Sequence, residues 1–219
     1  MKNKGQLIVY SGPSGVGKGT VLTEAIKRRG DIIRSVSATT RSPREGEIEG
    51  VDYFFVTKEE FNRKAENGEL LEFAEYNSQC YGTPSCFVRE NLENGKNVVL
   101  EIEVQGALRI RELMPSAVLI FLMPPNFETL KLRLTGRKTE SEEQIVKRLT
   151  AAATEIEKAH LYDFIVINDE LEAAVGDFLA CVDSAPHLVR LNGDFVNRTQ
   201  EDAKEFSHTV DMVTKCLNL

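Results

Sequence analysis

The segment Ser11–Thr20, SGPSGVGKGT, decides the fold of this sequence. It matches the phosphate-binding loop pattern G-x-x-x-x-G-K-[ST], except that Gly19 stands where a hydroxyl is usual and the hydroxyl follows one place later as Thr20. Backbone N–H groups in such a loop bind anions, and the lysine adds a mobile positive charge. We therefore predict a phosphate-binding loop made of Gly12, Pro13, Ser14, Gly15, Val16, Gly17, Lys18, Gly19 and Thr20.

The residues on either side give the loop its expected context. Gln6–Gly12 is a short apolar run typical of a buried strand, and apolar residues recur at helical spacing from Val21 to Arg29. A strand before the loop and a helix after it are what phosphate binding requires. An ordinary turn between a strand and a helix is the competing interpretation.

Apolar runs and helical patterns alternate along much of the chain. We predict further strands at Asn97–Ile102, Ala117–Leu122 and Phe164–Ile167, and helices at Pro84–Asn94, Val104–Leu113, Phe127–Leu134 and Glu142–His160. Such alternation indicates a parallel sheet covered on both faces. The predicted fold is α/β, a three-layer P-loop fold with a central parallel sheet.

One stretch interrupts this alternation and divides the chain. Residues 35–83 are polar, with strand-like pieces at Tyr53–Val56 and Leu70–Tyr76, and we interpret them as an insert. Residues 1–34 and 84–185 then form the core, with a lid at 135–148, where Ser141 and Gln144 form a capping box. Residues 186–219 form a C-terminal extension whose apolar spacing from Ala203 to Leu217 predicts an amphipathic helix, which either docks on its own domain or contacts another subunit.

The composition limits the possible partners. The 219 residues have a formal net charge of −7, which argues against a nucleic acid polymer but not against a nucleotide in a local basic pocket. No apolar run is long enough to cross a membrane, and the N-terminus lacks a cleavable signal pattern, so we predict a cytoplasmic protein. The four cysteines form no C-x-x-C pair, which favours reduced thiols over a zinc site.

The insert carries side chains suited to a second phosphate group and a base. Arg41, Arg44 and Tyr53 suit a phosphate, although a solvated surface is the competing interpretation. A carboxylate in LLEFAEY accepts two hydrogen bonds from the N1–H and N2–H edge of guanine, and Thr83 in CYGTP can donate to O6. Residue patterns alone do not choose between Glu72 and Glu75.

Charged residues also stand where strands end and in the expected lid. Glu101 and Glu103 follow a predicted strand and suit a magnesium-bound water or a sugar hydroxyl, with solvated loop acids as the alternative. Arg133, Arg137 and Arg148 flank the basic loop TGRKTE, where arginines can stabilise a transferring phosphoryl group. A basic surface helix is the competing interpretation.

Together and in this order, several motifs resemble those of guanylate kinase, a P-loop nucleoside monophosphate kinase. The resemblance spans about Gly5 to Val182 and rests on GPSGVGKGT, SATTRSPREGEIEGVDYFFV, LLEFAEY, YGTP, EIEVQGA, LTGRKTESEEQIVKRL and IVINDE. It implies transfer of the γ-phosphate of ATP to GMP with Mg²⁺, giving ADP and GDP. It also implies a core, a GMP-binding insert and a lid that close together.

The resemblance assigns roles to individual residues. The loop would hold the ATP phosphates, with Arg133 and Asn168 near adenine. Lys18, Arg44, Arg137 and Arg148 would act in catalysis. The GMP-binding residues would be Ser37, Arg41, Arg44, Tyr53, Glu72, Tyr81, Thr83 and Glu103. Thr20 and Glu101 are the candidates near the metal, and a homodimer is an expected assembly.

This sequence departs from the family pattern at three places. Gly19 removes the usual metal-binding hydroxyl, so we expect the metal to rely on nucleotide oxygens and water. Glu103 stands where the family usually has aspartate, and the tail from about Pro186 exceeds the usual length. The competing functions are a guanylate-kinase-like protein-interaction module and a kinase for another nucleoside monophosphate. The intact loop and lid arginines argue against the module, and Glu72 with Tyr81–Thr83 favours guanine.

Overall fold

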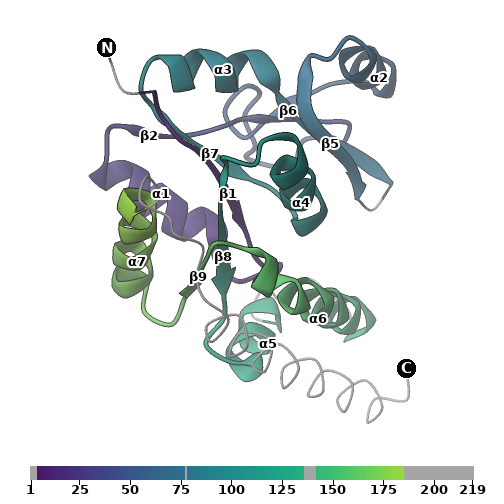
Figure 1. The fold of residues 1–219 in the computed structure, drawn as a ribbon. Coiled ribbons are helices and arrows are strands. Elements are labelled where there is room, and N and C mark those ends of the chain that lie inside the picture. Colours follow the sequence, from purple (N-terminus) through teal and green to yellow (C-terminus); the bar gives the residue numbers. More distant parts are fainter. Residues whose placement is uncertain (1–3, 77, 136–141, 185–219) are drawn as a thin grey trace. The chain divides into compact units, whose positions relative to one another are not determined.

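The computed structural model describes residues 4–76, 78–135 and 142–184 (Figure 1). Its strands are β1 Leu7–Ser11, β2 Ile32–Arg34, β3 Ser37–Thr39, β4 Tyr53–Phe55, β5 Leu70–Tyr76, β6 Gln79–Pro84, β7 Asn97–Glu101, β8 Val118–Met123 and β9 Phe164–Ile167. Its helices are α1 Lys18–Arg28, α2 Lys58–Glu66, α3 Ser85–Glu93, α4 Val104–Leu113, α5 Phe127–Thr135, α6 Glu142–Glu157 and α7 Leu171–Ser184.

The first sheet has the strand order β2-β7-β1-β8-β9. The pairs β2–β7 and β8–β9 are parallel, in registers that place Ile32 beside Asn97 and Ile120 beside Phe164. Every residue of β1 and β8 is buried, as expected for parallel strands covered on both faces. The predicted parallel sheet is confirmed.

The second sheet has the strand order β4-β3-β6-β5 and comes from the predicted insert. The strand pieces predicted at Tyr53–Val56 and Leu70–Tyr76 are found as β4 and β5. The structure adds β3, β6 and α2, which are not among the elements expected from the sequence. Phe61 of α2 is buried against Ala38 and Cys80, and this small core explains why α2 packs there.

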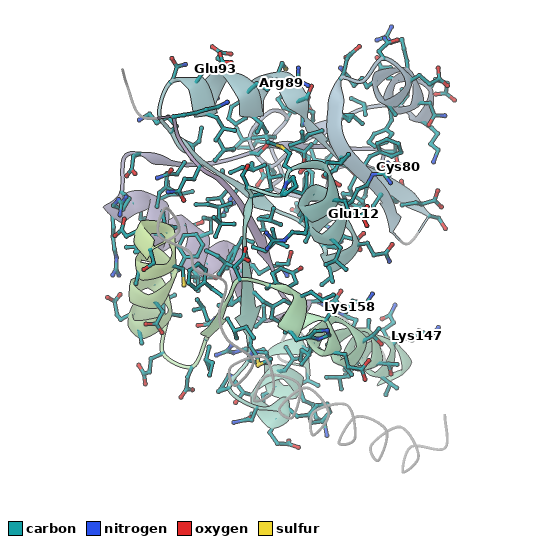
Figure 2. All side chains as sticks on the ribbon, in the orientation of Figure 1. Cys80, Arg89, Glu93, Glu112, Lys147 and Lys158 are labelled. Atoms are coloured by element: carbon teal, nitrogen blue, oxygen red, sulfur yellow. The ribbon has the colours of Figure 1, made fainter. Side chains whose placement is uncertain are left out.

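Amphipathic spacing accounts for most helices. In α3, Val88 and Leu92 are buried while Arg89 and Glu93 face solvent, where Figure 2 labels them. The helix predicted to reach His160 ends instead at Glu157, and a short 3₁₀ helix follows at Ala159–Leu161. Helix α7 was not predicted, and it lies beside α1 (Figure 1).

The described chain divides into two compact units. The first contains residues 4–9 and 29–117, including the second sheet, and the second contains residues 10–28 and 118–184, including the glycine loop. The expected division into core, insert and lid stays a prediction. The C-terminal helix, Ser141 and Arg137 lie outside the described residues. None of the helices in the described ranges combines the length and the hydropathy that a membrane span requires.

Candidate active site

The glycine loop connects β1 to α1 and adopts a backbone that needs glycine. Gly12 has φ +155° and Gly17 has φ +97°, both outside the range that other residues commonly adopt. A Cβ on Gly12 would lie 2.3 Å from the carbonyl oxygen of Leu122, and one on Gly17 would lie 2.7 Å from Nδ2 of Asn168. The loop therefore takes this path only because side chains are missing at both positions.

Lys18 bends back over the loop from the first position of α1. Its Nζ donates hydrogen bonds to the carbonyl oxygens of Gly12, at 2.5 Å, and Pro13, at 3.2 Å. The ammonium group thus lies at the loop itself. An anion bound by the loop N–H groups and the helix N-terminus would meet this positive charge.

Two further side chains hold the loop from outside. Asn168 Nδ2 and Arg133 Nη1 both donate to the carbonyl oxygen of Val16, at 2.7 and 3.3 Å, and Arg133 Nη2 donates to the carbonyl oxygen of Asn168 at 3.0 Å. Both residues were predicted near adenine. The structure brings them together at the loop, and their contact with adenine stays a prediction.

One lid arginine reaches the loop from α6. Arg148 Nη2 donates to the hydroxyl of Ser14 at 2.7 Å, so a guanidinium group lies beside the predicted phosphate-binding segment. Arg137, the other arginine predicted to act on the transferring group, lies outside the described residues. The second unit therefore holds Lys18, Arg133, Arg148 and Asn168 around one loop.

Arg41 organises the predicted phosphate site of the first unit. It donates to both carboxylate oxygens of Glu47, at 2.8 and 2.9 Å, and stands over the Tyr53 ring at 5.3 Å. These hydrogen bonds with Glu47, assisted by Tyr81, raise the pKa of the Arg41 guanidinium above its ordinary value. Tyr81 also lies near Tyr53, with ring centroids 6.1 Å apart. Three residues predicted to bind the GMP phosphate are thus gathered in one place.

The other two residues of that predicted set lie close by in the chain or the sheet. Ser37 pairs in register with Tyr53 across β3 and β4. The backbone N–H of Arg44 donates to Glu47 at 2.7 Å, while the residue itself is exposed. Glu47 therefore ties Arg41 and Arg44 together. Sequence reasoning missed Glu47, although its acidic side chain stands among the arginines of SPREGE.

Glu72 is a buried carboxylate beside Thr83. It is 4% exposed, and its Oε1 accepts a hydrogen bond from the Thr83 hydroxyl at 2.7 Å, because the two residues pair in register on β5 and β6. Burial, with a smaller contribution from the nearby charge of Glu103, raises the pKa of Glu72 to about 6, although the hydrogen bond from Thr83 and the charge of Arg109 act to lower it. An acceptor and a hydroxyl are thus held together in a dry environment.

The structure also separates Glu72 from Glu75. Residues three apart on a strand point to opposite faces, and Glu75 is exposed, with its carboxylate 3.7 Å from Lys58. Only Glu72 therefore has the burial and the hydroxyl partner that a base-reading carboxylate needs. Because strand register sets this difference, the residue pattern alone did not show it.

The predicted acidic residues after β7 have different surroundings. Glu101 faces Arg34, with 3.5 Å between Oε2 and Nε, whereas Glu103 occupies the N-cap position of α4 without a capping hydrogen bond from its side chain. Glu103 also contributes to the raised pKa of Glu72. The structure therefore brings Glu103, and not Glu75, into the environment of the buried acid.

The oxygen donors near the loop bear on the expected metal. Gly19 offers no side chain, and Thr20 is exposed on α1. Among the described residues, no three His, Cys, Asp or Glu side chains gather as metal ligands. Magnesium in kinase sites keeps several waters and takes most other ligands from substrate phosphates. The residues present thus fit a metal carried by a nucleotide, with Thr20 as the nearest candidate hydroxyl in sequence.

Comparisons with known proteins point to one family. The family model described as guanylate kinase matches residues 4–185. A guanylate kinase of Halalkalibacterium halodurans is 53% identical over 189 residues, covering 86% of this chain and 92% of the relative. That of Bacillus subtilis is 50% identical over 192 residues, covering 87% and 93%.

A solved structure leads to the same family. The crystal structure of guanylate kinase from Anaplasma phagocytophilum has a TM-score of 0.71 and 35% sequence identity, and the match covers 86% of this chain and 89% of that one. The matched region contains the glycine loop, the Glu72–Thr83 pair and Arg148. The chain belongs to the guanylate kinase family.

Proposed function

We propose that this protein transfers the γ-phosphate of ATP to GMP, giving ADP and GDP, with Mg²⁺ as the accompanying ion. The observation that carries the proposal is the buried Glu72 carboxylate, hydrogen-bonded to Thr83 at 2.7 Å. Guanine presents two neighbouring N–H donors to such an acceptor, and adenine presents no such pair. Relatives at 44–53% identity that are named guanylate kinase support the same reaction.

The proposed acceptor site has two parts. Glu72 accepts hydrogen bonds from the guanine edge, with Glu103 nearby. The Thr83 hydroxyl donates its single proton to Glu72 Oε1 and so holds that carboxylate in place for the base. The GMP phosphate is bound by side chains of the first unit, namely Ser37, Arg41, Arg44, Tyr53 and Tyr81. The carboxylate of Glu47 occupies the guanidinium fork of Arg41, so incoming phosphate shares or replaces that partner.

The proposed donor site is the glycine loop. The backbone from Gly12 to Thr20 cradles the ATP phosphates, and Lys18 neutralises their charge. Arg148, with Arg137, stabilises the charge that spreads over the transferring phosphoryl group, while Arg133 and Asn168 fix the loop. A magnesium ion, with the Thr20 hydroxyl as the candidate protein group near it, would supply positive charge that offsets the charge of the phosphates.

No covalent enzyme intermediate is required. A phosphate oxygen of GMP attacks the γ-phosphorus, the bond between that phosphorus and the bridging oxygen breaks, and ADP departs with the electron pair. The chain's own residues position the reactants and stabilise charge. We further propose that the protein acts in the cytoplasm on ATP and GMP, without nucleic acid or membrane partners. A homodimer stays a prediction.

The test is ADP release from Mg–ATP with GMP, AMP, CMP and UMP as separate acceptors. The proposal predicts strong turnover with GMP alone. Lys18→Ala is the matched control, which should remain folded by circular dichroism and lose nearly all turnover, because the loop then lacks its mobile charge. Turnover with AMP as fast as with GMP would favour another monophosphate kinase. A folded protein that phosphorylates none of the four would favour an interaction module.

A further inference from the structure

Gly106 lies against the carboxylate of Glu72. A Cβ built on Gly106 would be 3.0 Å from Oε2 of Glu72, 3.6 Å from its Cδ and 3.3 Å from Cδ1 of Ile102. Non-bonded heavy atoms pack best at roughly 3.5 to 4.0 Å, so a methyl group there would press on the acid. The other oxygen, Oε1, is held by Thr83. The carboxylate is thus fixed on one side by a hydroxyl and bounded on the other by a bare helix backbone.

The helix itself gives no reason for a glycine at this place. Gly106 is buried in the first turn of α4, and its backbone does not adopt a positive φ. Glycine in a helix interior is less favourable than alanine, because its backbone loses more conformational freedom on folding. The neighbouring Val104 and Ala107 are buried as well, so a small apolar side chain would suit the helix. What distinguishes Gly106 from these neighbours is that the Glu72 carboxylate fills the space where its side chain would lie.

Because α4 packs on β5, an added methyl group on Gly106 would displace the Glu72 carboxylate. The two elements lie in contact within the first unit (Figure 1). The charged groups that act on Glu72 are Glu103, at the N-cap of α4, and Arg109 of α4, and Thr83 contacts it from β6. A carboxylate in a close-packed interior cannot yield to a methyl group without turning or shifting. Such a movement would alter the direction of the hydrogen bonds that it accepts.

We propose that Gly106 is a positioning residue for guanine recognition. Its missing side chain leaves the Glu72 carboxylate where Thr83 holds it and where the base meets it. This inference rests on the proposed function. The expected consequence of Gly106→Ala is a KM for GMP raised roughly 10- to 100-fold, because charge-assisted hydrogen bonds are strong and directional. Neither kcat nor the KM for ATP should change more than about twofold, because the loss is one of uniform binding.

The experiment compares Gly106→Ala with Gly176→Ala. Gly176 is also a helical glycine, in α7, and a Cβ there would meet nothing within 4 Å. Steady-state kinetics with GMP and ATP, together with urea unfolding, are measured for the parent and both variants. Gly176→Ala should keep the parent's kinetics. A raised KM for GMP in Gly106→Ala alone supports the proposal, and an unchanged KM for GMP overturns it.

A double-mutant cycle distinguishes a direct contact between position 106 and the Glu72 carboxylate from a general loss of stability. Glu72→Asp shortens the acid by one methylene and clears the methyl group of Gly106→Ala. The effects of the two substitutions on the free energy of unfolding should therefore not add. Glu72→Asp should destabilise the protein less when Gly106→Ala is also present than when it is made alone. Additive effects would overturn the proposal. If Gly106→Ala alone fails to fold, recovery by the shorter acid supports the contact and failure to recover overturns it.

This cycle also keeps the inference distinct from the proposed function. If the parent protein phosphorylates no acceptor, the proposed reaction is contradicted, and binding of GMP is then measured by calorimetry. Weaker GMP binding in Gly106→Ala than in Gly176→Ala still supports the positioning role. Equal GMP binding in both variants, or none in the parent, overturns it.

Discussion

At the scale of single residues, the burial of Glu72 opposes the charge that its proposed role requires. Its carboxylate is 4% exposed, and burial disfavours the charged form that best accepts hydrogen bonds from guanine. The Thr83 hydroxyl offsets part of this penalty by donating to Oε1. A carboxylate held away from water for the proposed reading of guanine should therefore lower the free energy of unfolding of the protein without ligand, and this effect can be measured.

Replacing Glu72 with glutamine should stabilise the fold at neutral pH. Folding raises the pKa of Glu72 to about 6, because burial disfavours the charged carboxylate, and this rise makes the fold about 2 kcal/mol less stable when the acid is ionised. Below pH 4.5 the acid is protonated in both the folded and the unfolded state, so its burial costs no stability. Because the folded pKa is the higher one, the unfolded chain loses its proton first, and the folded state becomes less stable as the pH rises from 4.5 to 6. Urea unfolding of parent and Glu72→Gln should thus diverge across that window and differ by about 2 kcal/mol above it. A difference that does not vary with pH would contradict the assignment.

The same titration should appear in GMP binding. Below about pH 6 the protonated acid no longer accepts both guanine donors, so the KM for GMP should rise up to about tenfold per pH unit. The GMP phosphate titrates in the same range, with a second pKa of about 6. Glu72→Gln is therefore the control, since its profile retains only the contribution of the phosphate. Identical profiles for the two proteins would show that Glu72 does not titrate in this range.

At the scale of elements, the connection between β1 and α1 depends on backbone rather than on side chains. Gly12 has φ +155°, and a Cβ there would lie 2.3 Å from the carbonyl oxygen of Leu122 in β8. A side chain on Gly12 would thus collide with the backbone of Leu122, which cannot rotate away as a side chain could. The path of the loop and the packing of two strands are therefore linked at one glycine.

Gly12→Ala should lower the free energy of unfolding by roughly 2–4 kcal/mol, through strain and the displaced strand. Gly30→Ala is the matched control, because a Cβ there meets nothing within 4 Å and no positive φ is required. Chemical denaturation of both variants measures the contrast. Equal stabilities would mean that the loop tolerates a side chain, against the geometry of Gly12.

The elements differ in how well the sequence predicts them. The strands β1, β7, β8 and β9 are apolar runs of the first sheet, and local pattern suffices to predict them, although in β9 only Val166 is buried. Strand β6 contains Gly82 and Pro84, residues depleted in strands, and it forms because it pairs with β5 and β3. Helix α2 has a readable signal that was missed, the capping box of Thr57 and Glu60.

At the scale of the whole molecule, the residues of the two proposed nucleotide sites belong to different units. Lys18, Arg148 and the loop lie in the second unit, whereas Glu72, Thr83 and Arg41 lie in the first. The two substrates should therefore stabilise the protein through separate sets of side chains. A substitution in one set should leave the response to the other nucleotide intact.

Thermal unfolding with each nucleotide tests this separation. A ligand at about 100 times its Kd adds about 2.7 kcal/mol of stability, a clear rise in Tm. Lys18→Ala should lose the rise given by a non-hydrolysable ATP analogue and keep that given by GMP, and Glu72→Gln should do the reverse. Loss of both responses in either variant would contradict the assignment of the two sites.

Much of the candidate site could be predicted from sequence, and the rest depends on packing. The glycine loop is local, so its pattern identifies Gly12 to Thr20 directly. The preference for Glu72 over Glu75, the pairing of Arg41 with Glu47 and the space beside Gly106 arise from strand register and from α4 lying on β5. Contacts between distant segments leave no short pattern in the sequence.

The most direct test of the account is the ratio of kcat/KM for GMP to that for IMP, measured with Mg–ATP in the parent and in Glu72→Gln. IMP lacks the 2-amino group, so the parent should prefer GMP by roughly 10- to 100-fold, the loss expected for one hydrogen bond to a charged acceptor. In Glu72→Gln the ratio should fall towards one. A parent that uses IMP as well as GMP, or a variant that keeps the parent's ratio, would contradict the reading of guanine by Glu72.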